Sequence, residues 1–343
     1  MNHEVQERPS ASDEVKTRVP RLGFLGVGWI GKNRMQAIRE SKTASVVALC
    51  DPFAENTAQF CKDNNLRYVP SYEALLEEDI DGIVIATPNA LHKKQTLQAL
   101  NKGKAVFCQK PLGCTTADTL EVISAARSNN CLLMTDFSYR NTHSLQKIKT
   151  LIDANELGEV YAINLTFHTA HLPDKPWYYK PELSGGGCLM DFGVHLIDIL
   201  FWIFPSMEIN DIASTLYAQG KPVINGNKQV EDYAVCHLAA NTGLVAQLSC
   251  SWNTHIGKDA IIEFNFYGTK GGATFRNVNG SYYDFKSEFY KGTRRQVLSL
   301  PPDEWGGKAA VQWAAILANK NEYREEAEGY LKTAKVLDRL YKR

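Results

Sequence analysis

The stretch Arg21–Gly31, RLGFLGVGWIG, decides the fold of the N-terminal part of the chain. Its apolar start is typical of a buried β-strand, and Gly26, Gly28 and Gly31 give the spacing GxGxxG where a helical pattern begins. Asp51 ends the next apolar run, SVVALC. A glycine-rich turn between a strand and a helix, followed by such an acidic residue, is typical of a dinucleotide-binding unit. We therefore predict a dinucleotide site at this turn.

The residues of the turn have separate physical roles in this prediction. Gly26 permits the tight turn, Gly28 lets the backbone approach a pyrophosphate, and Gly31 allows the helix to pack closely on the strand. Trp29 and Ile30 open the helix, where free N–H groups bind phosphate. Lys32 and Arg34, further along, are expected on the exposed helix face, which assigns them no part in the site.

Asp51 bears on the choice of cofactor. Its carboxylate would accept hydrogen bonds from the adenosine ribose hydroxyls and would repel a 2′-phosphate. Pro52 and Phe53 follow it, so no arginine stands immediately after it to bind such a phosphate. The sequence therefore favours NAD over NADP.

Apolar runs alternate with helical patterns from Arg21 to about Asp136. The runs are almost continuously apolar, as in parallel strands that are buried on both faces. Strand character is clearest at 22–28, 45–51, 81–87, 104–110 and 131–137, and helical character at 31–40, 52–65, 72–78, 89–103 and 116–130. Pro52 suits a first helical turn, and residues 101–103 suit a helix end. The alternation predicts a doubly wound parallel sheet, that is, a Rossmann domain over residues 21–141.

The pattern changes after Thr142. One helical segment, 144–156, precedes strands with alternating polarity, which are clearest at 162–170, 232–240, 244–252, 261–268, 273–278 and 281–286. Residues 241–243 and the pair Asn279-Gly280 read as hairpin turns, the second as a two-residue loop. Helical sequence returns from about Lys308. We therefore predict an α+β domain over residues 142–343, with a large, mainly antiparallel open sheet, for an α/β protein overall.

Bulk properties limit the class of function. The 343 residues suit two domains, and Lys+Arg balance Asp+Glu at 38 each, so no net charge attracts nucleic acid or an anionic membrane. Residues 1–20 are polar, without an apolar signal core, and predict a disordered tail. Eight cysteines form no CxxC pair, which favours a reducing cytoplasm. No apolar run without a charge approaches the length of a membrane span.

The stretch Ser184–Phe204, SGGGCLMDFGVHLIDILFWIF, predicts a buried helix after three glycines. Asp191, His195 and Asp198 lie at i, i+4 and i+7, which places them on one helical face. Polar groups in such apolar surroundings need partners. This stretch alone is compatible both with a structural pair in the core and with a catalytic pair.

Three more segments extend the pattern. Residues 86–92, ATPNALH, follow one strand, Gln109-Lys110-Pro111 follow the next, and the Ser184–Phe204 stretch comes later. Together with the glycine-rich turn, they resemble the Gfo/Idh/MocA family, the glucose–fructose oxidoreductase and inositol dehydrogenase family. The resemblance covers nearly the whole chain after Arg21. The family typically has Glu-Lys-Pro, so Gln109 is a departure that bears on the tuning of Lys110 and on cofactor contacts.

The resemblance implies that Lys110, Asp191 and His195 form the catalytic set at a nicotinamide ring. The chemistry agrees: His195 is suited to be the general base for a secondary alcohol, and Lys110 to stabilise the oxygen that becomes alkoxide-like. Asp191 would orient the imidazole or bind a substrate hydroxyl, and Asp198 is expected to be structural. We also expect the bond before Pro111 to be cis.

Other candidates rest on less. The family pattern places Thr87, Pro88, Asn89 and His92, together with Gln109 and Lys110, among the cofactor contacts, although Asn89 and His92 could instead cap a helix. Candidate substrate contacts are Tyr139 and Arg140, just past a strand, and Trp177. Trp177 belongs to a polar and aromatic loop with His168, His171 and Tyr179, which suits either a sugar pocket or a contact between subunits.

The predicted function is an NAD(P)-dependent oxidoreductase acting on a sugar, sugar derivative or cyclitol. The alternatives are a non-catalytic NAD-binding regulator, an NAD-assisted glycosidase and a metal site at Asp191, His195 and Asp198; the last lacks a convincing ligand set. The resemblance implies a homodimer or homotetramer formed through the open sheet. Neither a nucleic-acid nor a membrane partner is expected. The sequence leaves open the substrate, its reacting carbon and the direction of reaction.

Overall fold

A parallel sheet forms the first half of the molecule. The computed structural model describes residues 18–51, 57–223 and 229–343; Pro52, Phe53 and almost all of the predicted tail lie outside them. Six parallel strands run in the order β3-β2-β1-β4-β5-β6, which confirms the predicted Rossmann sheet. Their bounds are β1 Arg21–Leu25, β2 Ser45–Cys50, β3 Arg67–Tyr68, β4 Gly82–Ile85, β5 Ala105–Gln109 and β6 Leu133–Asp136. The short β3 was not among the predicted strands.

Helices from both ends of the chain cover this sheet. The local helices are α1 (Trp29–Ser41), α2 (Thr57–Asp63), α3 (Tyr72–Leu76), α4 (Asn89–Asn101) and α5 (Thr116–Ser128). Helix α9 (Lys308–Asn319) returns from the C-terminal part to join them. Its Trp313 is fully buried with its ring 5.7 Å from that of Phe107, and a methyl group at Gly82 would lie 2.9 Å from the Trp313 ring. The absence of a side chain at Gly82 therefore allows α9 to pack.

The second half is built on a nine-stranded sheet in the order β15-β14-β13-β12-β7-β11-β10-β8-β9. All neighbours are antiparallel except β7 and β11, which confirms a mainly antiparallel sheet. The bounds are β7 Val160–Thr169, β8 Ile209–Ala218, β9 Lys221–Pro222, β10 Tyr233–Ala240, β11 Val245–Ser251, β12 Ala260–Gly268, β13 Gly272–Asn277, β14 Phe285–Lys291 and β15 Arg294–Ser299. The turn at residues 241–243 joins β10 to β11, as predicted.

The connection between β13 and β14 differs from its prediction. Asn279 and Gly280 do have positive φ angles of 52° and 81°, as a tight turn requires, but the strands pair only from Asn277 and Phe285 outward. The two-residue hairpin and a strand starting at residue 281 were therefore wrong. The extra residues carry Tyr282 and Tyr283 away from the sheet.

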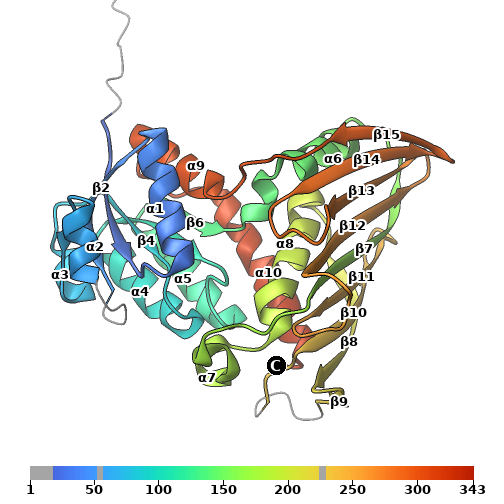
Figure 1. Cartoon of the computed structure of the whole chain (residues 1–343), viewed down its shortest axis with the longest axis horizontal. Helices are drawn as coiled ribbons and strands as arrows, with labels where there is room; N and C mark the ends of the chain where they lie inside the picture. The colour runs from blue at the N-terminus through green and yellow to red at the C-terminus, as the bar shows by residue number, and fades with distance from the viewer. Residues whose placement is uncertain (1–17, 52–56, 224–228) are drawn as a thin grey trace, which may run out of the picture.

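Among the described residues, the helices that pack on the nine-stranded sheet lie on the face that is turned toward the parallel sheet, and its other face carries no helix (Figure 1). The remaining helical segments are η1 (Ser138–Asn141), α6 (His143–Asp153), η2 (Pro176–Tyr179), α7 (Pro181–Ser184), the π-helical turn η3 (Leu189–Gly193), α8 (Val194–Ile203), η4 (Glu325–Ala327) and α10 (Glu328–Leu340). The large sheet is thus open on one face. The boundaries proposed at residues 20/21 and 141/142 stay predictions.

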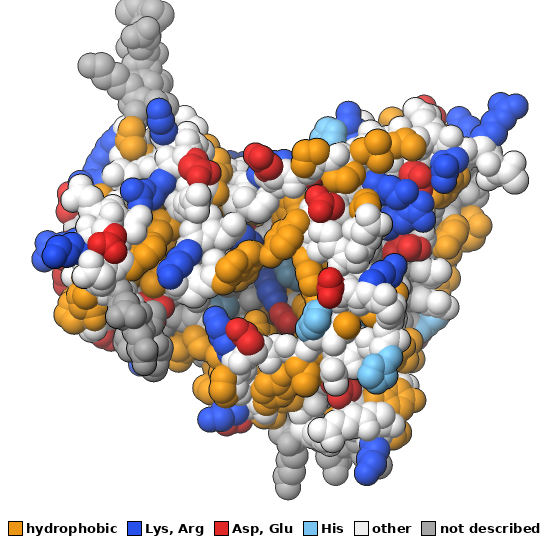
Figure 2. All heavy atoms as spheres, in the orientation of Figure 1, with side chains coloured by type: hydrophobic (Ala, Val, Ile, Leu, Met, Phe, Trp, Pro, Cys, Tyr) orange, Lys and Arg blue, Asp and Glu red, His pale blue; other side chains and the backbone are white. Residues whose placement is uncertain are grey.

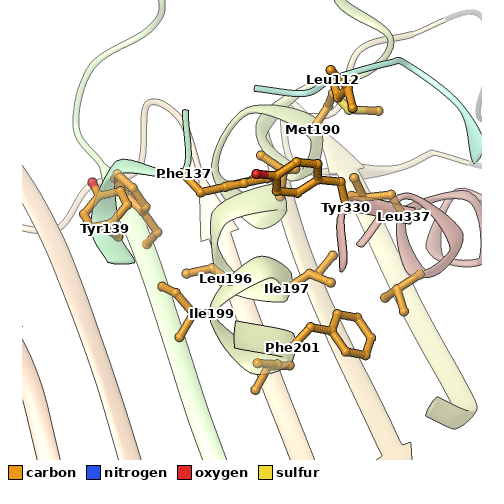
Figure 3. Close-up of a cluster of buried hydrophobic side chains, with 14 of the residues drawn as sticks. Leu112, Phe137, Tyr139, Met190, Leu196, Ile197, Ile199, Phe201, Tyr330 and Leu337 are labelled. Atoms are coloured by element: carbon orange, nitrogen blue, oxygen red, sulfur yellow. The ribbon is translucent and has the colours of Figure 1, made fainter. Parts of the chain in front are cut away.

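Helix α8 is the centre of the core. Leu196, Ile197 and Ile199 are fully buried, and Figure 3 shows the helix with Tyr330 and Leu337 of α10 on one side and Tyr139 on the other. The stretch Pro181–Ile203 has the length and hydropathy of a membrane span, but 78% of its apolar window is buried inside the protein. Its apolar character is that of a core helix.

Candidate functional site

The glycine-rich turn has the geometry that its sequence predicts. Gly26 has φ 89°, and a methyl group there would lie 2.5 Å from the carbonyl oxygen of Ala86 on the neighbouring strand end. A methyl group at Gly31 would lie 2.2 Å from the carbonyl oxygen of Gly26. A side chain at Gly26 would therefore collide with the end of β4 and strain the backbone, whereas one at Gly31 would push α1 away from the turn.

The N-terminus of α1 is prepared for an anion. Gly28 is its N-cap, no described side chain caps the helix, and no acidic residue stands in its first turn. The first N–H groups of a helix have no partner within the helix, so those at Gly28, Trp29 and Ile30 can bind phosphate oxygens. Asp51 accepts the N–H of Val27 at 2.8 Å, which holds its carboxylate beside the turn. These residues fit a dinucleotide.

Trp29 extends from this turn toward the second half of the molecule. Its side chain is 58% exposed, and its ring centroid lies 6.0 Å from that of Tyr283 in the loop after β13. The dinucleotide turn and the second sheet therefore meet across one cleft. Figure 2 shows this face hollowed between the halves, with basic, acidic and histidine side chains in and around the hollow.

Lys110 and Asp191 connect the two halves at this cleft. The Lys110 ammonium donates to the Asp191 carboxylate at 2.5 Å and to the Asp191 carbonyl at 2.8 Å, and both side chains are mostly buried. The other oxygen of Asp191 accepts the indole N–H of Trp252 at 3.2 Å. The Lys110–Pro111 bond is cis, as predicted. The carboxylate is thus held from two sides, by one residue of each half.

His195 stands one turn after Asp191, where the π-helical turn η3 passes directly into α8. Such π-turns are frequent at functional sites. Burial, followed by the positive charges of Lys110 and Arg34, holds the pKa of His195 well below its ordinary value. Its ring meets that of Tyr139 edge-on at 5.1 Å, and its Nδ1 has no hydrogen-bond partner among the described residues. The imidazole is therefore neutral near pH 7 and able to accept a proton.

Arg34 corrects one expectation. It is buried, not exposed, and its guanidinium donates to Asp136 at 2.6 Å and to Ser138 at 2.8 Å. Gln109 donates its amide N–H to the same Asp136 carboxylate at 2.5 Å. Lys32 is exposed, as expected. The sequence of α1 alone could not reveal that Arg34 faces Asp136 at the end of β6, because this contact joins residues 102 positions apart.

In the segment 86–92, the side chains of His92 and Asn89 bind backbone carbonyl groups. His92 is fully buried, with Nδ1 2.7 Å from the Pro111 carbonyl and Nε2 2.8 Å from the Thr87 carbonyl. Asn89 does not cap α4; its amide donates to the Ser184 carbonyl at 2.8 Å, and Pro88 is the N-cap. In this structure His92 and Asn89 fasten the loops that carry Lys110 and Asp191.

Tyr139 and Arg140 lie beside α8, away from the cavity-lining residues. Tyr139 is 7% exposed and stacks on Trp305 at 5.2 Å. Arg140 forms a two-pronged ion pair with the buried Asp198, in which its Nε lies 2.7 Å from one carboxylate oxygen. Asp198 is therefore a structural partner, as expected. The guanidinium of Arg140 is already engaged in this pair, and Tyr139 supports the His195 ring.

A cavity of about 190 Å³ opens beside Asp191. Its lining includes three aromatic residues that the sequence did not single out: Tyr178, Trp252 and Tyr282. Trp177 stacks on Tyr178 at 3.9 Å behind this lining. Aromatic faces with polar edges suit a polyol, and only the tertiary structure brings these three segments together.

His168 does not belong to this loop. It lies on β7 and is held between Ser251 at 2.7 Å and Ser249 at 2.9 Å on β11, stacked on Tyr233. The strand alternates, with Phe167 and Thr169 buried on the helical side, so His168 faces the open side of the sheet. The predicted loop thus begins two residues too early, because β7 runs on to Thr169.

Glu231 supports the start of the π-helical turn, a contact that the sequence did not reveal. Its buried carboxylate accepts the N–H groups of Gly187 at 2.9 Å and Leu189 at 3.0 Å, and the Tyr341 hydroxyl at 2.7 Å. Burial raises the pKa of Glu231, against the opposite effect of these donors. A methyl group at Gly187 would lie 1.8 Å from the Glu231 carbonyl, which explains the last glycine of the run.

Comparison with known proteins agrees with this geometry. Residues 20–137 match the model of the oxidoreductase family with an NAD-binding Rossmann fold, and residues 145–274 match the Gfo/Idh/MocA C-terminal domain. The chain belongs to the Gfo/Idh/MocA family. Membership makes it an oxidoreductase with an NAD(P)-binding domain.

Curated relatives in the Gfo/Idh/MocA family include two sugar enzymes. The chain is 29% identical over 262 residues to 1,5-anhydro-D-fructose reductase of Ensifer adhaerens, covering 75% of this chain and 76% of that protein. It is 27% identical over 313 residues to glucose-6-phosphate 3-dehydrogenase of Bacillus subtilis, covering 87% and 89%.

Solved structures share the whole architecture. A 3-ketoreductase from Actinomadura kijaniata, in complex with NADP and TDP-benzene, superposes with a TM-score of 0.80 at 22% identity, covering 94% of this chain and 96% of that one. Levoglucosan dehydrogenase with NADH and levoglucosan gives 0.79 at 20%, covering 95% and 97%. At these identities the likeness establishes the Gfo/Idh/MocA fold. Since one neighbour holds NADP and the other NADH, it does not decide between the two cofactors.

Within the described residues of this Gfo/Idh/MocA protein, no group of three or more His, Cys, Asp or Glu side chains could hold a metal ion. Asp191 faces Lys110 and Trp252, whereas Asp198 faces Arg140. The two carboxylates, which were predicted to share one helical face, therefore bind different partners.

Proposed function

We propose that this oxidoreductase transfers a hydride between C4 of a nicotinamide and a secondary alcohol or ketone carbon of a sugar, sugar derivative or cyclitol. The observation that carries the proposal is the Lys110–Asp191 pair, which joins the two halves next to a neutral His195 and an aromatic cavity. When bound, the nicotinamide supplies the hydride acceptor or donor. The remaining work falls to side chains of the chain itself.

His195 acts as the general base in the oxidative direction. A neutral imidazole accepts the hydroxyl proton while hydride leaves the same carbon. Because its pKa is held well below the ordinary value, the base is ready at pH 7. In the reductive direction the roles reverse, and His195 or Lys110 supplies the proton to the carbonyl oxygen.

Lys110 stabilises the negative charge that develops on the substrate oxygen. An Asp191 carboxylate oxygen lies 2.5 Å from the Lys110 ammonium nitrogen and holds it in place. Asp191 also lines the cavity, where its carboxylate can accept a hydrogen bond from a substrate hydroxyl. The indole of Trp252 fixes the second carboxylate oxygen. We assign substrate binding to Tyr178 and Trp252 ahead of Tyr139 and Arg140, which lie behind the helix.

NAD is the proposed cofactor. Asp51 is held beside the turn by the N–H of Val27, where its carboxylate would meet the ribose hydroxyls and repel a 2′-phosphate. We further propose a homodimer or homotetramer formed through the open sheet face, and the cytoplasm as the compartment. Neither nucleic acid nor a membrane enters the proposal.

The test is turnover of purified variants with NAD and a panel of sugars, cyclitols and keto-sugars. His195→Ala and Lys110→Ala are each expected to lower kcat by about 10²-fold or more while leaving NAD binding largely intact. His143→Ala and Lys147→Ala, exposed on α6, serve as controls. In wild type, the oxidative kcat/KM should fall from protonation of His195 only well below pH 6.5, because the imidazole is neutral above its lowered pKa.

Three results would contradict the assignment. Wild-type turnover in either variant would remove that residue from the mechanism. NAD binding without turnover across the whole panel would indicate a regulator. Glycoside cleavage with no net NADH formation would indicate an NAD-assisted glycosidase.

A further inference from the structure

Lys175 reaches the dinucleotide turn from the other half of the molecule. A methyl group at Gly28 would lie 3.0 Å from the Lys175 ammonium, and it would meet no other atom within 4 Å. Gly28 is the residue at which the turn allows close approach of a pyrophosphate. Within the part of the chain that the structure describes, no carboxylate pairs with Lys175. The Lys175 ammonium therefore lies, without a carboxylate partner, beside Gly28, where the negatively charged diphosphate of a dinucleotide would bind.

The backbone around Lys175 is well fixed. Its carbonyl accepts the N–H of Tyr178 at 3.2 Å, and the Tyr179 hydroxyl donates to the Pro173 carbonyl at 2.6 Å. His171 contacts Asp259 at 2.9 Å at the start of the loop. The lysine therefore projects from a folded loop that keeps its base in a defined place.

The same loop lines the candidate substrate cavity. Asp174 and Tyr178, on either side of Lys175, contribute to the lining together with Asp191. A contact between Lys175 and a bound diphosphate would consequently fix one wall of the cavity. The N–H groups at the start of α1 and this ammonium would bind the anion from opposite sides of the cleft.

We infer that Lys175 is a diphosphate ligand supplied by the substrate half, which couples cofactor binding to the stability of the folded loop at residues 170–180. This inference rests on the proposed dinucleotide function. It assigns to Lys175 a role in binding and positioning, not in hydride transfer.

The experiment measures ligand affinity by calorimetry, with ADP-ribose and adenosine as probes, for wild type, Lys175→Gln, Lys175→Arg and the control Lys180→Gln. Lys180 is also exposed and lies on the same loop. Lys175→Gln should weaken ADP-ribose binding by roughly tenfold at low salt, because a charge-assisted hydrogen bond is lost. Adenosine binding should not change, Lys175→Arg should retain most of the affinity, and Lys180→Gln should behave as wild type.

Hydrogen exchange of residues 170–180 gives the second readout. ADP-ribose should protect these amides in wild type and in Lys180→Gln, but not in Lys175→Gln. ADP-ribose affinity of Lys175→Gln within twofold of wild type would overturn the inference while leaving the proposed function intact. Equal loop protection in that variant would overturn the coupling. A wild-type protein that binds neither NADH nor ADP-ribose would overturn both.

Discussion

Gln109 changes the pattern of charges beside Lys110, the lysine that we propose to be catalytic. Its amide donates to Asp136, which already carries the charge that balances Arg34. The family pattern has a carboxylate at this position, whereas here the carboxylate of the cluster comes from the end of β6. An amide at residue 109 therefore completes the hydrogen bonds of Asp136 without adding a second negative charge.

Gln109→Glu is expected to destabilise the fold by about 1–3 kcal/mol at pH 8 and by less at pH 5. The introduced carboxyl group would face the buried Asp136 and hold its proton to a higher pH in the folded state than in the unfolded chain. Stability then falls as pH rises between those two values, since the folded state binds more protons there. Urea unfolding at both pH values measures the change.

The control for this variant is Gln59→Glu on α2. Gln59 also donates to a carboxylate, that of Asp63 at 2.7 Å, but it does so on an exposed surface. This substitution should cost less than about 0.5 kcal/mol. If the two variants show equal losses, burial of the Asp136 cluster is not the cause.

At the level of single residues, the sequence predicted the features that depend on residues close together in the chain. The glycine spacing predicted the turn, and the i, i+4 spacing of Asp191 and His195 placed both near the cleft. The burial of Arg34 and the contacts of Tyr178 and Trp252 arise between segments far apart in the chain. No periodicity within one segment carries that information, so these residues were missed or misplaced.

The π-helical turn η3 and its support are the decisive features at the level of elements. The apolar pattern predicted one helix after three glycines, but a π-turn lies between these glycines and α8, and the buried N–H groups of Gly187 and Leu189 need acceptors. Glu231 provides the acceptor from the segment just before β10. Such a long-range cap leaves no mark near Asp191 in the sequence.

Glu231→Gln is expected to lower the free energy of unfolding by about 1–3 kcal/mol, because an amide nitrogen would replace an oxygen that accepts buried N–H groups. The fold-change in turnover should be larger than the fold-change in NAD affinity. The substitution would displace η3 and the start of α8, which carry Asp191 and His195 but not the glycine-rich turn. Chemical unfolding, NADH titration and steady-state kinetics measure the three quantities.

Glu182→Gln is the matched control, because Glu182 is exposed on α7 within the same stretch. It should change stability by less than about 0.5 kcal/mol. Unchanged stability and kinetics in Glu231→Gln would show that the π-turn holds its position without this carboxylate.

The strand pattern of the second half predicted the nine-stranded sheet but not where each strand begins and ends. The turn residues at Asn279-Gly280 have the expected backbone angles, yet pairing resumes only at Phe285. The loop instead brings Tyr282 to the cavity and Tyr283 to Trp29. Tertiary contacts across the cleft outweighed the local preference for a tight hairpin.

Within the described ranges of the chain, no helix covers the outer face of the nine-stranded sheet. Phe264 and Phe266 of β12 point inward and are buried, whereas Tyr267 is 40% exposed. On other strands, Val235 and Val297 are 43% and 48% exposed, and each pairs with a residue on the outward side of its neighbour. Isolated exposed apolar residues are common on protein surfaces, so the uncovered sheet face itself is the reason for placing the proposed subunit contact here.

Val235→Lys is therefore expected to weaken the proposed association of subunits. Val235 lies between Thr215 and Ser249 on the outward face, so the substitution leaves the core intact and adds a charge within the contact. Light scattering coupled to size-exclusion chromatography should give a dimer or tetramer for wild type and a smaller species for the variant. Leu120→Lys, at a 49% exposed position on α5, should leave the mass unchanged. A monomeric wild type, or an unchanged mass in Val235→Lys, would contradict an interface at this face.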